Sequence, residues 1–172
     1  MSRIHAVETK IVTLNEAAQC AEIYRLKGQK IVFTNGCFDL LHVGHVTYLA
    51  KAASMGEKLF VAVNDDASVK SLGKGENRPL NPEEARAVVL AALGFIDHVF
   101  IFREPTPLAS ILAIRPDFVV KGGDYDENTT DKTDKRYIVG KEEVEAWGGV
   151  VKTIPLVEGY STTLLLSKSG QA

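Results

Sequence analysis

Short apolar runs alternate with longer amphipathic segments along the whole chain. Five runs rich in β-branched and aromatic residues predict buried strands at residues 30–36, 58–64, 98–102, 117–123 and 150–155. The segments around them have helical spacing, capping residues or terminal glycines, and they predict helices at residues 14–30, 40–56, 65–73, 82–93, 107–115, 140–149 and 161–170. This order predicts an α/β fold: a single Rossmann-like, doubly wound, mostly parallel five-stranded sheet with helices on both faces.

Composition and charge narrow the class of protein. The 172 residues predict one domain, residues 1–172, with a core at about residues 30–168 that follows an N-terminal helix. The net charge of −2 leaves no basic surplus for nucleic acid, and the hydrophobic share of 45% is ordinary for a globular protein. No apolar run reaches the roughly 18 residues of a membrane helix, and the N-terminus lacks the apolar core of a signal peptide. The two cysteines, Cys20 and Cys37, form no disulfide framework or zinc motif, so we expect a soluble, cytoplasmic protein with no nucleic-acid or membrane partner.

Four polar clusters follow predicted strands at the point where each strand ends. They occupy residues 34–45, 64–66, 121–125 and 157–163. The carboxyl ends of parallel strands lie at one edge of a sheet, and doubly wound folds bind their ligands there. The sequence therefore predicts one binding crevice that all four clusters line.

The first cluster places two histidines, His42 and His45, three residues apart at the start of a predicted helix. On a helix this spacing puts both imidazoles on one face. The unpaired N–H groups and partial positive charge of a first helical turn favour a phosphate there, and Gly44 lets a bulky group approach the backbone. Gly36 permits a tight turn just upstream. Two alternatives stay open: a partly exposed polar pair, or a zinc site, for which no third ligand is evident.

The segment "TNGCFDLLHVGH", residues 34–45, resembles the signature of the HxGH nucleotidylyltransferases, the cytidylyltransferase-like superfamily. The segment "VEGYSTT", residues 157–163, is similar to the second signature of that superfamily in its glycerol-3-phosphate cytidylyltransferase branch. With "ENRPLNPEEAR", "VKGGDY", "YIVG" and "GGVVKTIPLVEGYSTT", the chain resembles the heptose-1-phosphate adenylyltransferases from about residue 30 to residue 168.

This resemblance implies a reaction and its participants. AMP would pass from ATP, accompanied by Mg²⁺, to the anomeric phosphate of D-glycero-D-manno-heptose 1-phosphate. The products would be ADP-heptose and pyrophosphate, on the route to the lipopolysaccharide inner core. In many members of the family this domain is fused to a sugar kinase, so a separate heptose kinase is the expected upstream partner here. The resemblance also implies a homo-oligomer.

The residues and the resemblance together assign roles at the site. The residues expected in catalysis are His42, His45, Lys74 and Arg86. The residues expected around the nucleotide are Thr34, Asn35, Gly36, Cys37, Phe38, Gly44, Lys121, Gly123, Asp124, Glu158, Gly159, Tyr160, Ser161, Thr162 and Thr163. The residues expected at the acceptor substrate are Asp39, Asn64, Arg78 and Arg136, and no residue is assigned to a metal.

Several of these residues have a structural alternative. Asp39 has three open roles: sugar binding, assistance to a magnesium ion, or capping of the next helix. Cys37 replaces a hydroxyl residue of some relatives and is alternatively a small buried hydrophobe. Lys74 and Arg78 are alternatively solvated charges on a loop, and Arg86 is alternatively the partner of Glu83 or Glu84 in a helical salt bridge.

Two departures from the resemblance bear on the acceptor. Glycerol-type relatives carry an arginine where Gly94 stands here and another where Val157 stands. These departures argue against the glycerol branch and shift phosphate binding towards Lys121, Arg86 or Arg136.

Other functions on the same fold stay open. One is transfer to another acceptor or from another base: glycerol 3-phosphate with CTP, a flavin phosphate, phosphopantetheine, or GTP with the α-heptose phosphate. Another is a non-catalytic nucleotide sensor, although such a protein would be expected to have lost one of the two histidines. The hydroxyl residues 161–163 start the last helix, so capping is part of their expected role.

Overall fold

All five predicted strands are present in the computed structural model, which describes residues 2–72 and 78–168. They are β1 (Ile31–Gly36), β2 (Lys58–Asn64), β3 (His98–Phe102), β4 (Phe118–Gly122) and β5 (Val150–Ile154). They form one sheet in the order β3-β2-β1-β4-β5, and each pair of neighbouring strands is parallel. The predicted doubly wound α/β fold is therefore confirmed, and the sheet is parallel throughout.

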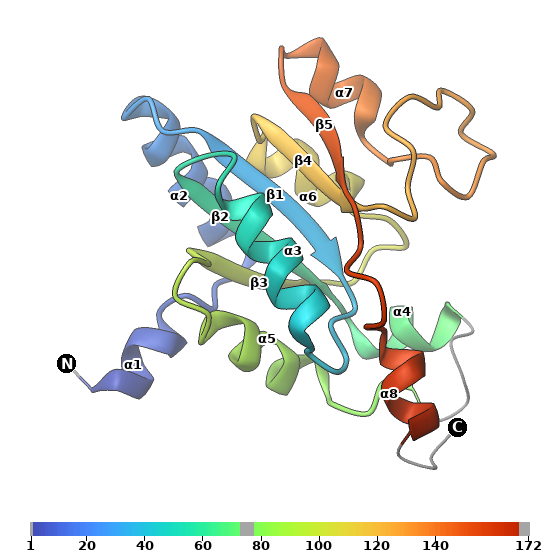
Figure 1. Ribbon diagram of the computed structural model, residues 1–172. Coiled ribbons are helices and arrows are strands. Elements are labelled where there is room, and N and C mark those ends of the chain that lie inside the picture. Colours follow the sequence, from blue (N-terminus) through green and yellow to red (C-terminus); the bar gives the residue numbers. More distant parts are fainter. Residues whose placement is uncertain (1, 73–77, 169–172) are drawn as a thin grey trace.

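Helices cover both faces of this sheet (Figure 1). They are α1 (Arg3–Glu8), α2 (Leu14–Leu26), α3 (Val43–Ala53), α4 (Asp66–Ser71), α5 (Glu83–Ala91), α6 (Leu108–Ile114), α7 (Lys141–Ala146) and α8 (Thr162–Lys168). Helices α3 and α5 pack on one face together with α1, and helices α2, α6 and α7 pack on the other. None of the helices in the described ranges is both long and apolar enough to span a lipid bilayer.

The strands are apolar on both sides because each side meets a helical layer. Val32, Leu59 and Val61 point into the layer of α3 and α5, whereas Phe33 and Phe60 point into the layer of α2 and α6. Each of these side chains is at most 1% exposed. Burial of an aromatic or branched side chain contributes about 1.5–3 kcal/mol, so the two layers hold the sheet from both sides.

Local sequence signals explain where several helices begin. Thr13 caps α2 with a capping box that includes Glu16, and Asp65 caps α4. The prediction placed the start of α3 at residue 40, but the helix begins at Val43 with His42 as its N-cap. The short helix α1 was not predicted because six residues carry too little periodic signal.

The strand order reverses between β1 and β4, and these two strands separate as they approach the carboxyl edge. The ladder between β1 and β2 continues to Gly36↔Val63. The ladder between β1 and β4 stops at Phe33↔Val119. A reversal of this kind leaves a crevice outside the carboxyl ends of the strands, which is where ligands bind in open α/β sheets.

Candidate active site

A cavity of about 790 Å³ opens at the carboxyl edge of the sheet, above β1 and β4. All four predicted polar clusters contribute to its lining, as expected for the ends of parallel strands. The predicted site residues that line it are Asn35, Gly36, Cys37, Phe38, Asp39, His42, Gly44, His45, Asn64, Arg78, Lys121, Asp124, Tyr160, Ser161, Thr162 and Thr163. The fold therefore brings together segments more than 100 residues apart in the sequence.

The structure does not place every predicted site residue in the lining. The predicted residues that lie elsewhere in the described ranges are Thr34, Arg86, Gly123, Arg136, Glu158 and Gly159. Arg136 is exposed and its guanidinium pairs with Asp134, 2.8 Å away, so it is turned to a carboxylate of its own loop. Lys74, expected in catalysis, lies outside the described residues.

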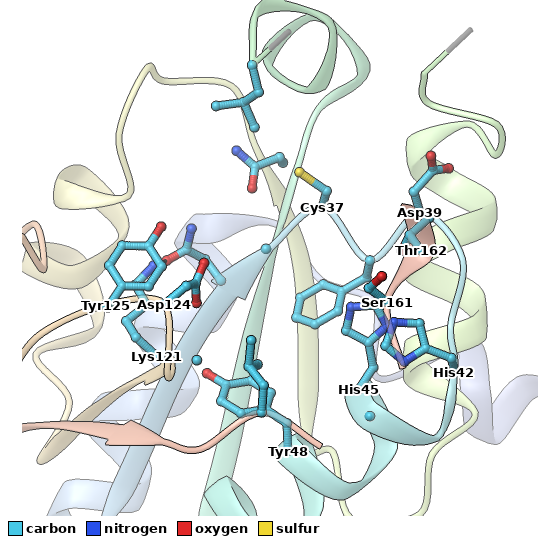
Figure 2. A pocket seen from close by; sticks show the side chains of 18 of the residues that line it. Cys37, Asp39, His42, His45, Tyr48, Lys121, Asp124, Tyr125, Ser161 and Thr162 are labelled. Carbon is cyan, nitrogen blue, oxygen red and sulfur yellow. Dashed lines mark hydrogen bonds between the residues drawn. The ribbon is translucent and has the colours of Figure 1, made fainter. Parts of the chain in front are cut away.

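The two imidazoles of His42 and His45, here called the histidine pair, stack on each other at the amino end of α3. Their ring centroids are 3.9 Å apart and the ring planes differ by 26°. The side chain of His42 makes no capping bond to the helix, and burial lowers the pKa of this imidazole below its ordinary value. Phe38 packs edge-on against His45, with centroids 5.5 Å apart. The histidine pair is thus held as one unit facing the cavity (Figure 2).

Gly44 is explained by this stacking more directly than by a ligand. A Cβ atom at Gly44 would lie 2.9 Å from Nδ1 of His42 and 3.4 Å from the Cβ of Tyr160. The expectation was that Gly44 lets a bulky ligand approach the backbone. The structure shows that it first makes room for the imidazole of its own neighbour.

The tight turn between β1 and α3 depends on Phe38 in addition to Gly36. Phe38 has a positive φ of 48°, which is rare for a bulky residue, whereas Gly36 has no such torsion. A Cβ atom at Gly36 would meet the Phe38 ring at 3.0 Å. Gly36 therefore lets the Phe38 ring fold back over the strand end, where it supports His45.

Asp39 holds a neighbouring loop segment and does not cap α3, whose N-cap is His42. Its carboxylate lies 2.5 Å from Nε of Arg78 and accepts hydrogen bonds from the backbone N–H groups of Leu80 (2.8 Å) and Asn81 (3.0 Å). With its side chain 0% exposed, Asp39 is occupied by protein partners. Of the three roles left open for this residue, capping is wrong, and the contacts favour positioning of the Arg78 segment beside the cavity.

Arg86 is fully buried beneath the cavity. Its guanidinium donates to the backbone carbonyl of Cys37 (2.6 Å), to that of Asn81 (3.0 Å) and to the carboxylate of Asp66 (2.6 Å). The expected alternative partner Glu83 instead accepts from the backbone N–H of Asp66 at 2.8 Å. These three acceptors lie on three segments around the cavity, and Arg86 is not among the residues that line it.

Lys121 reaches the cavity from the end of β4, opposite the histidine pair (Figure 2). Its ammonium group donates to the side-chain oxygen of Asn35 and lies 5.0 Å from the centroid of the Tyr125 ring. Burial lowers the pKa of Lys121 to about 8, and nearby Asp124 partly opposes that shift. The cavity thus has a cation on the side that faces the imidazoles.

The segment after β5 closes a further side of the cavity. Gly159 has a positive φ of 79° and allows the turn that precedes α8. The hydroxyl of Ser161 accepts a hydrogen bond from the backbone N–H of Leu164 at 3.1 Å, so the expected capping role is present. Thr162 and Thr163 line the cavity beside it.

Sequence reasoning missed part of the lining: Tyr48, Leu72, Pro105, Thr106, Pro107, Val139 and Leu156. Gly122, Tyr125 and Val157 also line the cavity; they lie in the predicted clusters but were given no individual role. The three residues 105–107 follow β3, so the carboxyl-edge argument applied to the third strand would have found them. Tyr48 lies one helical turn beyond His45, and the helical period pointed to it in the same way.

The described side chains do not form a metal-binding site by themselves. No three His, Cys, Asp or Glu side chains in the described ranges are grouped so that they could hold one. Asp39 is engaged by Arg78, while Asp124 also lines the cavity. Mg²⁺ usually takes one or two carboxylates and fills its shell with substrate phosphates and water, so Asp124 is the carboxylate of this lining that an ion carried by a nucleotide would meet.

Comparison with known proteins finds relatives that match almost the whole chain. The bifunctional protein HldE from Koribacter versatilis is 48% identical over 165 residues, which are 96% of this chain and 32% of that protein. The bifunctional protein HldE from Geobacter metallireducens is 50% identical over 161 residues, 94% of this chain and 31% of that protein. The chain therefore spans about a third of the length of these curated relatives.

Solved structures share the fold. The lipopolysaccharide core biosynthesis protein from Thermoplasma volcanium has a TM-score of 0.59 and 25% identity, and the match covers 78% of this chain and all of that one. The pantoate-beta-alanine ligase from Francisella tularensis, solved with beta-gamma ATP and beta-alanine, has a TM-score of 0.57 at 15% identity, and the match covers 84% of this chain and 66% of that one. The Cytidylyltransferase-like family profile matches residues 33–167, from β1 to α8. Since that range includes the histidine pair, Lys121 and the start of α8, this chain belongs to the cytidylyltransferase-like family of nucleotidyltransferases.

Proposed function

We propose that this protein transfers AMP from ATP to D-glycero-D-manno-heptose 1-phosphate and releases pyrophosphate. The product, ADP-heptose, would serve synthesis of the lipopolysaccharide inner core. The observation that carries the proposal is the single cavity lined by the histidine pair, Lys121 and the start of α8. These groups supply hydrogen-bond donors and positive charge from different sides of one crevice, as a polyphosphate substrate requires.

The proposed chemistry needs no protein nucleophile. An oxygen of the sugar phosphate attacks the α-phosphorus of ATP, a new P–O bond forms, and the bond to the bridging oxygen breaks so that pyrophosphate leaves with that electron pair. The attacking oxygen belongs to a substrate that is already ionised, so no proton has to be removed from it. The protein has to align two polyanions and neutralise their charge.

Different residues of the cavity have different roles in binding and neutralising the phosphates. The histidine pair and the uncapped first turn of α3 donate to phosphate oxygens from one side. Lys121 approaches from the opposite side and balances the negative charge that builds up on the α-phosphate. Mg²⁺ bound with ATP would neutralise further phosphate charge, with Asp124 as its protein ligand. Asp39 and Arg86 hold the surrounding loops in place.

Two findings support the choice of acceptor. The HldE relatives match more than nine-tenths of this chain at close to half identity. The Thermoplasma volcanium protein that shares the fold is itself named for lipopolysaccharide core biosynthesis. The proposal also includes a kinase that phosphorylates the heptose beforehand, a homo-oligomeric assembly and a cytoplasmic location.

The function is tested by incubating the purified protein with ATP, Mg²⁺ and heptose 1-phosphate and measuring pyrophosphate. We expect release that depends on all three. Parallel reactions contain GTP with the α-anomer, CTP with glycerol 3-phosphate, or ATP with a flavin phosphate or phosphopantetheine. A higher rate in any of these reactions would replace the proposed substrate pair, and tight ATP binding without release in every reaction would favour a sensor.

The pKa of Lys121 predicts how the activity changes at alkaline pH. Its ammonium is charged below its pKa of about 8 and loses its proton, and with it the attraction to phosphate, as pH rises through that value. We therefore expect kcat/KM, which reports the free enzyme, to fall tenfold for each pH unit well above about 8.

The control is Lys121→Arg, because a guanidinium stays charged across this range. This variant should be slower overall but should lose the alkaline decline, whereas Lys121→Met should be slow at every pH. An unchanged decline in Lys121→Arg would assign it to another group.

A further inference from the structure

We propose that Tyr48 is a positioning residue that sets the distance between the histidine pair on α3 and Lys121 on β4. The kinetic part of this inference rests on the proposed function. Its structural part rests on the contacts of one buried hydroxyl group at the point where β1 and β4 separate.

The backbone ladder between β1 and β4 stops at Phe33↔Val119, just before the cavity. One residue further towards the cavity, the Tyr48 hydroxyl connects the two strands by hydrogen bonds. It donates to the carbonyl oxygen of Val120 at 2.8 Å and lies 2.7 Å from the hydroxyl of Thr34. The Tyr48 hydroxyl has one proton and donates it to the Val120 carbonyl, so the Thr34 hydroxyl must be the donor in its bond to Tyr48. The phenol therefore joins both strands where they no longer join each other.

The same side chain belongs to the helix that carries the histidines. Tyr48 follows His45 by three residues on α3, so the two side chains lie on one face of the helix. Val120 immediately precedes Lys121. Tyr48 thus links the helix that carries the histidine pair to the strand that carries Lys121, and Figure 2 shows Tyr48 between these two groups.

Burial makes this connection rigid. Tyr48 is 8% exposed and Thr34 is 0% exposed, so water does not readily replace either partner. The Val120 carbonyl is likewise buried, and an unpaired carbonyl there would be costly. One further side-chain contact crosses the gap: the Lys121 ammonium bonds to the Asn35 oxygen, one residue beyond Thr34. Loss of the Tyr48 hydroxyl therefore leaves the spacing between the histidine pair and Lys121 under weaker control.

In-line transfer is sensitive to that spacing, because misplacement by about 1 Å can cost about 100-fold in rate. Tyr48→Phe keeps the ring and removes only the hydroxyl. We expect kcat to fall by about 10- to 100-fold, with KM for ATP changed by less than about threefold, since the groups that bind phosphate are all retained. Thr34→Val removes one of the two bonds and should give a smaller decrease in kcat.

The matched control is Tyr24→Phe. The Tyr24 hydroxyl also makes a partly buried hydrogen bond, 2.9 Å from Nε2 of His98, but it lies on α2 and does not line the cavity. This variant should lose a comparable bond while turnover stays at the wild-type level. If Tyr24→Phe lowered kcat as much as Tyr48→Phe, or if Tyr48→Phe raised KM for ATP instead of lowering kcat, the positioning role would be refuted.

A measurement without substrate separates this inference from the proposed function. The imidazole ¹H–¹³C signals of His42 and His45 should shift in Tyr48→Phe and stay in place in Tyr24→Phe, where only the His98 signal should move. Suppose that these shifts are seen but the wild-type protein releases no pyrophosphate. The shifts would then support the positioning role, and the missing release would refute the proposed acceptor. Unmoved histidine-pair signals in Tyr48→Phe would overturn the inference whatever the wild-type activity is.

Discussion

Replacement of His45 by alanine is expected to reduce pyrophosphate release by about 100- to 1,000-fold, the cost of removing one preorganised donor from a site of developing negative charge. The reduction should fall mainly on kcat, because the imidazole is proposed to bind more tightly as charge builds up on the phosphate oxygens. The measurement is steady-state pyrophosphate release at saturating ATP and sugar phosphate, alongside the thermal unfolding midpoint.

His42→Ala should act in the same way, and the two effects should not add. The rings stack at a centroid distance of 3.9 Å, so removal of either one leaves the other without its stacking partner. Residues in direct contact that act as a unit are strongly non-additive. The double variant should therefore lose much less than the product of the two single losses. If the loss of activity in the double variant equalled the product of the two single losses, the imidazoles would act independently.

His5→Ala is the control for loss of any histidine. His5 lies on α1, and its side chain is 51% exposed. We expect wild-type turnover from it. Single variants of the histidine pair that keep turnover within about threefold of wild type would contradict the electrostatic role, since that difference is below 1 kcal/mol of transition-state stabilisation.

The strands and the position of the cavity could be predicted from the sequence because both depend on short-range patterns. Apolar runs bounded by glycines and polar clusters mark the strands, and β2 and β3 begin and end as predicted. The carboxyl-edge rule then converts four clusters in the sequence into one crevice. Asn64 and Ser161 are 97 residues apart, yet this rule alone is enough to place them in one cavity.

The partners of individual side chains could not be predicted in this way. Asp39 binds backbone groups 41 and 42 residues away, and Arg86 donates to a carbonyl 49 residues away. Such bonds depend on how loops from different strands pack together, and no periodicity in the sequence encodes that. A motif comparison finds that a charged residue stands at a position, but only the packing tells whether it faces the substrate or the protein.

The left-handed torsion at Phe38 illustrates the same limit. Sequence patterns assign positive φ to glycine, and Gly36 was the natural candidate in this turn. The structure places the strain on the aromatic residue and uses the glycine as space for its ring. Strain at a bulky residue beside a binding cavity is tolerated where the surrounding structure holds it, here by burial of Phe38 to 7% exposure and its contact with His45.

Arg86→Met is expected to lower the free energy of unfolding by about 3–5 kcal/mol, the range seen when one partner of a buried ion pair is removed. Methionine keeps an unbranched stem of similar length but donates no hydrogen bonds. The Cys37 and Asn81 carbonyls would lose their guanidinium donors, and Asp66 would lose its counter-charge. The side chain of Asp66 is 34% exposed, so its carboxylate can recover some hydration, which places the expected loss near the lower end. Urea unfolding measures the change.

Arg103→Met is the matched control for this loss. Arg103 forms ion pairs with Glu83 and Asp65 in the same region, but its side chain is 68% exposed, and exposed pairs contribute about 0–1 kcal/mol. If Arg86 acts only by holding the cavity walls, Arg86→Lys should recover part of the stability and, in parallel, part of the turnover, because one ammonium can reach only some of the three acceptors. Turnover lost in Arg86→Lys while stability returned to the wild-type value would instead place the guanidinium in contact with substrate, as the family resemblance implies.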